Sequence, residues 1–291
     1  MDKLMKVIIV GASGYIGRPL YTEASRLFET YGTLSSTQEK DSAFLPLRLE
    51  TPEHFDYSFI KKSDVILLTA AISAPDICSR EHDRAWAANV TGTSALISEI
   101  IGRGGRVIFF SSDTVYGERV DSIDEQAICN PAGEYAVMKH EVEKRFIGNP
   151  MFKAIRLSYV FSREDKFTKY LSGCAERGEE AEIFHPFYRS VIHRDDVVQG
   201  GIALAQRWDE LPQPVINFGG SETLARTEFA QLLKETALPA LKYRITEPAA
   251  EFFKNRPRVI RMESPILPSL LGRPVHALRE AALIEFNLKE K

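Results

Sequence analysis

The stretch VIIVGASGYIG, residues 7–17, is the most informative part of this 291-residue chain about its fold. Its first four residues are apolar and predict a buried strand, and glycines follow at Gly11, Gly14 and Gly17. Gly11 allows a tight turn, Gly14 lets the backbone approach a pyrophosphate, and Gly17 lets the next helix pack on the strand. The N-terminus of that helix offers free N–H groups and partial positive charge to phosphates. In this context the pattern predicts a dinucleotide site, although a bare glycine pattern also fits an ordinary turn.

Strand and helix patterns alternate through the first half of the chain. The run DVILLTAA, residues 64–71, is what a strand buried on both faces of a parallel sheet requires. Residues 83–102 have helical apolar spacing, and further strands are expected at 32–35, 107–110 and 154–157, with a helix at 135–146. This order predicts an α/β fold of the Rossmann type, a doubly wound parallel sheet.

The rhythm breaks at about residue 160, where short helical pieces alternate with prolines and glycines. We therefore predict a dinucleotide-binding domain over residues 1–158 and a smaller mixed α/β substrate lobe over 159–291. Residues 190–220 are expected to return to the first domain.

Composition and charge restrict the class of protein. Charged residues make up 26% of the chain and the formal net charge is -3, which gives no electrostatic reason to expect nucleic acid or a membrane as partner. The cysteines, Cys78, Cys129 and Cys174, form no CxxC pair, which argues against a zinc site or a disulfide framework. No stretch approaches the ~20 apolar residues that cross a bilayer. We expect a cytoplasmic protein without a metal site.

The end of the predicted second strand bears on the choice of cofactor. NAD-preferring proteins of this fold carry an acid there, which binds the ribose hydroxyls. Here no acid occurs before Glu39, whereas Ser35, Ser36 and Thr37 can hydrogen-bond a 2′-phosphate and Arg18 could assist. The sequence favours NADP(H) and leaves NAD(H) as the alternative.

Tyr135 and Lys139 lie four residues apart and therefore share one face of a helix. A phenol has a pKa of about 10, and a nearby ammonium lowers it. Tyr135 is thus a candidate general acid or base, and Lys139 can also hold the ribose of the cofactor. The pattern alone also fits a half-buried tyrosine beside a surface lysine. Its weight comes from the glycine turn and from the hydroxyl-rich stretch SSDTVYG, residues 111–117, at the end of a strand.

In this order the motifs resemble the extended short-chain dehydrogenases/reductases, which are sugar-nucleotide epimerases, dehydratases and reductases. Segments at 89–93 (NVTGT), 155–158 (IRLS) and 189–196 (RSVIHRDD) extend the resemblance over most of the chain. The resemblance implies a catalytic hydroxyl at Ser112, a catalytic tyrosine and lysine at Tyr135 and Lys139, and a supporting Asn89.

The resemblance also implies that Arg189 and Arg256 contact the diphosphate of a nucleotide-linked substrate, and guanidinium groups suit phosphate oxygens. The residues expected to bind the cofactor, from the turn, the strand ends and the lysine, are Gly11, Ser13, Gly14, Tyr15, Ile16, Gly17, Ser35, Ser36, Ala70, Ala71 and Lys139.

Two residues after Ser112 narrow the reaction. The dehydratases of the family follow the catalytic hydroxyl with Asp-Glu, whereas this chain has Asp113-Thr114, and a threonine cannot replace a glutamate as base. We therefore do not expect dehydration, and we assign Asp113 and Thr114 to substrate binding. The segment AAISAPD, residues 70–76, resembles the dTDP-4-dehydrorhamnose reductase branch, whereas Arg189 and the IHRDD segment resemble the epimerases.

These observations predict an NADP(H)-dependent reductase of a nucleotide-linked 4-keto-deoxysugar. Nicotinamide would supply the hydride and Tyr135 the proton. Two alternatives stay open: an NAD-dependent sugar-nucleotide epimerase that holds its cofactor tightly, and a non-catalytic NAD(P)-binding regulatory protein. A nucleotide sugar is the expected partner, and a homodimer is an assembly that the sequence leaves open.

Overall fold

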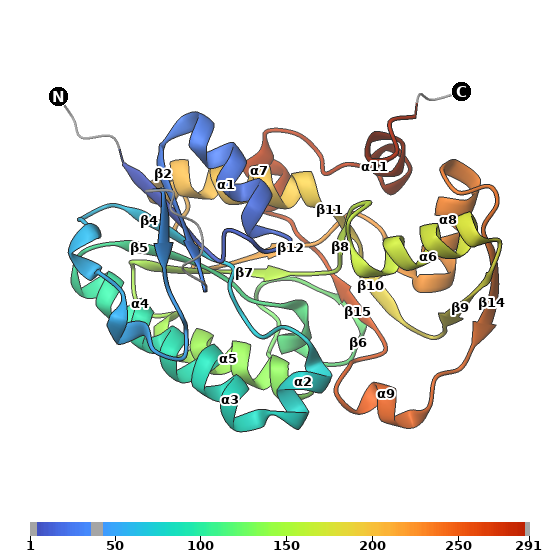
Figure 1. The fold of residues 1–291 in the computed structure, drawn as a ribbon, viewed down its shortest axis with the longest axis horizontal. Helices are drawn as coiled ribbons and strands as arrows, with labels where there is room; N and C mark the ends of the chain where they lie inside the picture. Colours follow the sequence, from blue (N-terminus) through green and yellow to red (C-terminus); the bar gives the residue numbers. More distant parts are fainter. Residues whose placement is uncertain (1–4, 36–42, 289–291) are drawn as a thin grey trace.

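A seven-stranded parallel sheet forms the centre of the computed structural model, which describes residues 5–35 and 43–288 (Figure 1). The strand order is β12-β7-β5-β4-β1-β2-β3, and each neighbouring pair is parallel. The chain therefore runs outward from β1 in both directions, which places a topological switch point between β1 and β4. This confirms the predicted Rossmann-type fold. The bounds are β1 Lys6–Val10, β2 Glu29–Leu34, β3 Phe44–Pro46, β4 Val65–Leu68, β5 Arg106–Phe110, β7 Phe152–Leu157 and β12 Val215–Phe218.

Helices cover both faces of the sheet because its central strands are buried on both sides. Every residue of β1 and β4 is buried. One face packs against α1 (Gly17–Leu27), α7 (Arg194–Gln206) and α10 (Leu267–Leu271). The other face packs against α4 (Thr93–Gly102) and α5 (Glu134–Phe146), so continuous apolar runs along the strands find apolar partners above and below (Figure 1).

The segment predicted as one helix over 83–102 is divided into three parts. It consists of α3 (His82–Trp86), a π-helical turn, η3 (Ala87–Gly92), and α4. The side chain of Asn89 in η3 binds both backbone groups of Ile72, with Oδ1 accepting from the N–H at 2.8 Å and Nδ2 donating to the carbonyl at 2.9 Å. These two bonds join the turn to the segment after β4, and π-bulges often occur at functional sites.

A second group of elements lies to one side of the sheet, and we call it the second lobe. It contains α6 (Lys166–Arg177), β9 (Glu180–Phe184), β10 (Tyr188–Ser190), β13 (Thr223–Ala225), α8 (Arg226–Thr236), β14 (Lys242–Thr246) and α11 (Leu278–Glu285). β10 pairs with β13, β14 pairs with β9, and residues of α6, α8 and α11 share one apolar core. This is the smaller mixed α/β lobe expected from the sequence. The boundaries at 158 and 159 stay a prediction, while β12 and α7 belong to the layers of the central sheet.

Short elements connect the two parts. β8 (Val160–Phe161) pairs with β11 (Ile192–His193), and β6 (Arg119–Ile123) pairs with β15 (Ile260–Met262). The remaining pieces are the helices α2 (Pro75–Arg80) and α9 (Ala250–Lys254) and the 3₁₀ turns η1 (Pro52–His54), η2 (Tyr57–Phe59), η4 (Asp113–Tyr116) and η5 (Trp208–Glu210). Within the two described ranges, no helix has the length and apolar character that a membrane span requires.

Candidate active site

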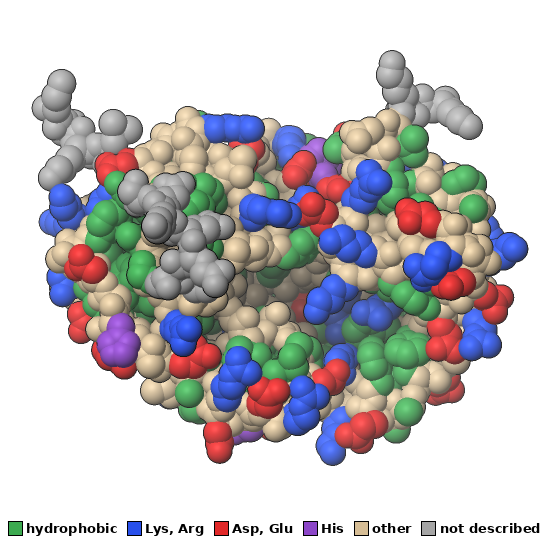
Figure 2. All heavy atoms as spheres, viewed as in Figure 1, with side chains coloured by type: hydrophobic (Ala, Val, Ile, Leu, Met, Phe, Trp, Pro, Cys, Tyr) green, Lys and Arg blue, Asp and Glu red, His purple; other side chains and the backbone are tan. Residues whose placement is uncertain are grey.

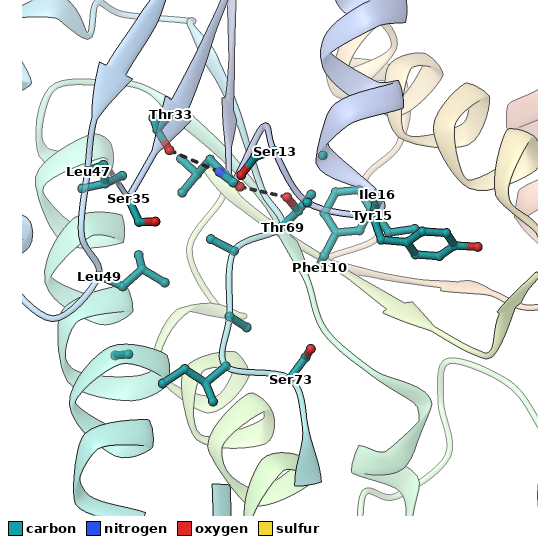
Figure 3. A pocket seen from close by; sticks show the side chains of 18 of the residues that line it. Ser13, Tyr15, Ile16, Thr33, Ser35, Leu47, Leu49, Thr69, Ser73 and Phe110 are labelled. Carbon is teal, nitrogen blue, oxygen red and sulfur yellow. Dashed lines mark hydrogen bonds between the residues drawn. The ribbon is translucent and has the colours of Figure 1, made fainter. Parts of the chain in front are cut away.

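The glycine turn between β1 and α1 leaves room for phosphate because three residues lack side chains. Gly11 has φ +91°, a conformation that L side chains rarely adopt, and a Cβ on Gly17 would lie 2.0 Å from the carbonyl oxygen of Gly11. The turn is tied to its neighbours: Gly11 N donates to Thr33 Oγ1 at 3.2 Å, and Thr69 Oγ1 donates to the carbonyl of Val10 at 2.8 Å (Figure 3). The backbone is thus held open at the N-terminus of α1, which fits the pyrophosphate of a dinucleotide.

A cavity of about 540 Å³ lies in front of this turn, at the carboxyl ends of β1, β2, β4 and β5 (Figure 3). Its walls include all but one of the residues predicted to bind a cofactor, namely Gly11, Ser13, Gly14, Tyr15, Ile16, Gly17, Ser35, Ala70, Ala71 and Lys139. Ser36, the remaining one, lies outside the described residues. The Tyr15 phenol points away from the cavity and donates to Ser162 Oγ at 2.8 Å.

Several lining residues had no signal in the sequence. Leu47, Arg48, Leu49 and Glu50 follow β3, and Arg84 comes from α3. β3 pairs with β2, so its carboxyl end reaches the same edge of the sheet as the predicted cofactor residues. A sequence reading that placed a third strand beside β2 would have found the four residues after it.

Tyr135 and Lys139 both line this cavity from one face of α5. Lys139 is buried, its Nζ donates to the carbonyl of Phe110 at 2.8 Å, and it lies 5.8 Å from the centroid of the Tyr135 ring. Burial lowers the pKa of the Lys139 ammonium to about 8. The two side chains therefore lie next to each other at the carboxyl end of β5, where a substrate could reach both.

The pKa of Tyr135 differs from the sequence-based expectation. We expected the ammonium of Lys139 to lower it, but in the structure burial raises it above the ordinary value, and Cys78 and Asp113 act in the same direction. The physical reason is that Lys139 directs its Nζ to a backbone carbonyl, while the phenol is largely removed from water. Tyr135 is consequently protonated near neutral pH, which suits a proton donor.

Ser112 lies at the turn after β5, where it accepts hydrogen bonds from Thr114 N at 3.3 Å and Thr114 Oγ1 at 2.9 Å. Its own hydroxyl donates to Asp113 Oδ1 at 3.3 Å. Ser112 does not belong to the cavity lining, whereas Ser111 does. Both serines therefore lie at the end of β5, and the hydroxyl of Ser111 is itself buried near the carboxylate of Glu143.

Asn89 does not line the cavity, and no described hydrogen bond joins it to Lys139. Its two bonds to the backbone of Ile72 fix a residue that lines the cavity just after Ala70 and Ala71. Asn89 therefore holds the cavity wall in place.

The residues expected to bind substrate lie apart from this cavity. Asp113 is buried, and its Oδ2 accepts from Ser158 Oγ at 2.9 Å and lies 3.6 Å from Arg189 Nε. Burial raises the pKa of the Asp113 carboxyl, and Arg189 opposes the shift. Thr114 is half-buried and is bonded to Ser112.

The two arginines expected at the diphosphate already have partners in the protein. Arg189 is buried and donates to the carbonyls of Tyr188 at 2.6 Å and Pro257 at 2.8 Å. Arg256 forms a two-point ion pair with Asp76, with N–O distances of 2.8 and 2.6 Å, and it lines a separate cavity of about 720 Å³. Neither guanidinium is free to turn to a ligand without losing these contacts.

One group of residues has the composition of a metal site. The ligand atoms of Cys129, His140 and Glu143 lie within 4.8 Å of one another. Glu143, however, forms a buried ion pair with Arg156 at 2.7 Å. A guanidinium that already neutralises this carboxylate would repel a cation beside it, so we assign no metal here.

Comparisons with known proteins agree with this geometry. The family model described as "RmlD substrate binding domain" matches residues 5–280. Methionine adenosyltransferase 2 subunit beta of Mus musculus is 24% identical over 276 residues, which cover 91% of this chain and 82% of that protein. A dTDP-4-dehydrorhamnose reductase of Sinorhizobium fredii is 29% identical over 147 residues, half of each chain.

Among solved structures, MoeE5 in complex with UDP-glucuronic acid and NAD has a similar fold. Its TM-score is 0.81 at 20% sequence identity, and the match covers 97% of this chain and 98% of that one.

Proposed function

The chain belongs to the RmlD substrate binding domain family, within the extended short-chain dehydrogenases/reductases, and from this premise we propose that it is an NADP(H)-dependent reductase of a nucleotide-linked 4-keto-deoxysugar. One observation carries the proposal: Tyr135, Lys139 and the glycine turn line the same cavity at the switch point of the sheet. A tyrosine next to a dinucleotide turn has a direct use in the reduction of a carbonyl group.

The side chains divide the work as follows. A nicotinamide cofactor, when bound, exchanges a hydride with the sugar carbon. Tyr135, which burial keeps protonated, gives its proton to the sugar oxygen, and the ammonium of Lys139 offsets the negative charge that remains on the phenol. The hydroxyl of Ser112, supported by Thr114, would hydrogen-bond the sugar oxygen from the turn after β5, beside the cavity lining, in exchange for its bond to Asp113 Oδ1.

The test is a screen of NADPH oxidation across nucleotide-linked 4-keto sugars, with NMR analysis of the products. We expect consumption of NADPH and a reduced sugar with one of them. Release of an isomerised sugar without net consumption of NADPH would instead support the epimerase, which should also retain bound nicotinamide through purification.

The preference for NADP(H) is supported by the charged residues of the cavity, which are Arg48, Glu50, Arg84 and Lys139. Arg84 pairs with Glu81 at 2.7 Å and lies 4.0 Å from Glu50. Arg48 Nε donates to the carbonyl of Ser35 at 3.2 Å, and no carboxylate of the described residues pairs with it. Arg18, which we had considered for this role, instead pairs with Glu164 at 3.3 Å, outside the cavity.

Arg48 is therefore the cation that we propose for the 2′-phosphate, beside the hydroxyl of Ser35. A guanidinium can bind phosphate through two parallel hydrogen bonds. Glu50 lines the same cavity, and the cation of Arg84, 4.0 Å from it, offsets its negative charge.

A second candidate function is a nucleotide-binding subunit without turnover of its own. The relative from Mus musculus favours it, because its name describes a subunit of another enzyme and the match covers 91% of this chain. The presence of Tyr135 and Lys139 in the cavity favours catalysis. Two results together would support the subunit. The protein would bind nucleotide without turning over any 4-keto sugar, and its mass by light scattering would show a stable complex with another protein. The same measurement decides whether the chain forms a homodimer, which stays a prediction.

A further inference from the structure

The guanidinium of Arg226, the first residue of α8, lies between two aromatic rings and has no carboxylate partner within the described part of the chain. Its central carbon is 4.4 Å from the centroid of the Phe187 ring and 4.9 Å from that of Phe167. Arginine stays charged at physiological pH, and a half-buried cation without a counter-ion loses part of its hydration with no charge to offset the loss. A bound anion would neutralise this charge.

The surroundings of Arg226 add to its positive charge. The guanidinium of Arg189 packs on the same Phe187 ring at 4.3 Å. Burial lowers the pKa of Arg226, and the charges of Arg189 and Arg256 act in the same direction. The acid that favours the cation, Asp165, already accepts hydrogen bonds from the phenol of Tyr159 at 2.6 Å and from two backbone N–H groups at the start of α6. Several arginines therefore lie close together here, and among the described residues Arg226 has no carboxylate paired with it.

Contacts connect this cluster to the reactive end of the site. Arg189 Nε lies 3.6 Å from Asp113 Oδ2, and Asp113 Oδ1 accepts from the hydroxyl of Ser112. Figure 2 shows a hollow between the central sheet and the second lobe, with lysine and arginine side chains gathered along the edge toward the second lobe. A long substrate with its sugar at Ser112 would extend toward these cations.

We propose that Arg226, which the sequence pattern did not indicate, binds the diphosphate of the nucleotide-linked substrate. This inference rests on the proposed function. Arg189 and Arg256 have their donors on backbone carbonyls and on Asp76, whereas no described hydrogen bond uses the guanidinium of Arg226. The two rings hold the plane of the guanidinium, which then presents a fixed pair of N–H groups to phosphate oxygens.

The test uses isothermal titration of the full chain with UDP, dTDP and inorganic pyrophosphate. Arg226→Met should weaken the binding of UDP or dTDP about 10- to 100-fold, the range for hydrogen bonds to charged groups. The matched control is Arg244→Met, which removes a cation of the second lobe that pairs with Glu182 at 2.7 Å on the surface. It should bind as the unaltered protein does. The Tm of free Arg226→Met should equal or exceed that of the unaltered protein, because an unpaired cation is removed.

Unchanged binding by Arg226→Met would overturn the proposal, and so would failure of all three probes to bind the unaltered protein at millimolar concentration. If Arg226→Met does not fold, Arg226→Lys decides, because it keeps the charge and loses the planar fork. Equal binding by that variant would overturn the proposal, and weaker binding would support it. Absence of NADPH oxidation together with Arg226-dependent UDP binding would reject the reductase and leave this site standing.

Discussion

The nucleotide cavity and the arginine cluster of the second lobe, which consists of Arg189 and Arg226 with the rings of Phe167 and Phe187, are built in opposite ways. The cavity depends on the backbone of one short stretch, Gly11 to Gly17, whose glycines leave space and expose N–H groups. The cluster depends on side chains from segments far apart in the chain, including Phe167, Phe187 and Arg226. A site made by contiguous backbone can be recognised in the sequence as a motif. A site made by side chains from distant segments can be identified only in the folded structure.

The largest effect is expected in the nucleotide cavity, at Tyr135. Tyr135→Phe keeps the ring and removes the proton, so kcat for a 4-keto sugar should fall about 10²- to 10⁴-fold, the usual contribution of general acid catalysis. The Kd for NADPH should stay within about twofold of the unaltered value, since the turn is intact. Stopped-flow or steady-state NADPH oxidation measures the first quantity, and fluorescence titration measures the second. Intact turnover would remove Tyr135 from the mechanism.

The second prediction concerns the cost of a buried charge in the cavity. Lys139→Met should abolish activity. It should nevertheless raise the free energy of unfolding at pH 7 by up to about 3 kcal/mol, because burial lowers the pKa of Lys139 from 10.5 to about 8. Below pH 8 both folded and unfolded chains carry this proton, so the penalty is fully present. From pH 8 to about 10.5 the unfolded chain binds more protons, the unaltered protein gains stability, and the advantage of the variant shrinks.

Urea denaturation at pH 7 and pH 10 measures this difference. Lys144→Met is the matched control, because Lys144 is an exposed lysine on the same helix that pairs with Glu141. It should change stability by less than about 0.5 kcal/mol at either pH. A Lys139→Met variant that is less stable than the unaltered protein at pH 7 would show that the bond to the Phe110 carbonyl outweighs the cost of burial.

The third prediction tests whether the cavity depends on backbone. Gly17→Ala places a Cβ 2.0 Å from the carbonyl oxygen of Gly11, so it should destabilise the fold by about 1–3 kcal/mol and weaken NADPH binding. Gly102→Ala at the end of α4 meets nothing within 4 Å and should be neutral or slightly stabilising. Thermal unfolding with and without NADPH compares the two. Equal effects from both substitutions would mean that the turn tolerates a side chain and that its glycines are not the cause of binding.

The smallest effect is expected for cofactor choice, where a single side chain acts within the backbone-made cavity. Arg48→Ala should lower kcat/KM for NADPH about 10-fold and leave that for NADH unchanged, because only NADPH carries the 2′-phosphate. Arg18→Ala, which breaks the pair with Glu164 outside the cavity, should alter neither. A loss of preference for NADPH in Arg18→Ala but not in Arg48→Ala would reverse the assignment.

By itself the sequence determined the fold class and the location of the cofactor turn. Val7 to Val10 and Val65 to Leu68 are apolar at every position, and a strand without a polar face has to lie inside a sheet covered on both sides. The glycine spacing that follows β1 is typical of the turn that binds the pyrophosphate of a dinucleotide. The helical spacing of Tyr135 and Lys139 placed both residues on one face, and this face meets the cavity.

Which side chains meet at the site, and what charge they carry, depends on contacts that form when the chain folds. The approach of β3 to β2 brought Arg48 to the cavity, and the path of the backbone after β5 made Ser111, and not Ser112, part of the cavity lining. The pKa of Tyr135 depends on how far the fold removes its phenol from water. Arg189 and Arg256 donate to acceptors within the protein, whereas Arg226 keeps its N–H donors for a ligand. Local spacing fixes periodicity along one element, whereas desolvation and pairing depend on segments that the sequence separates by tens of residues.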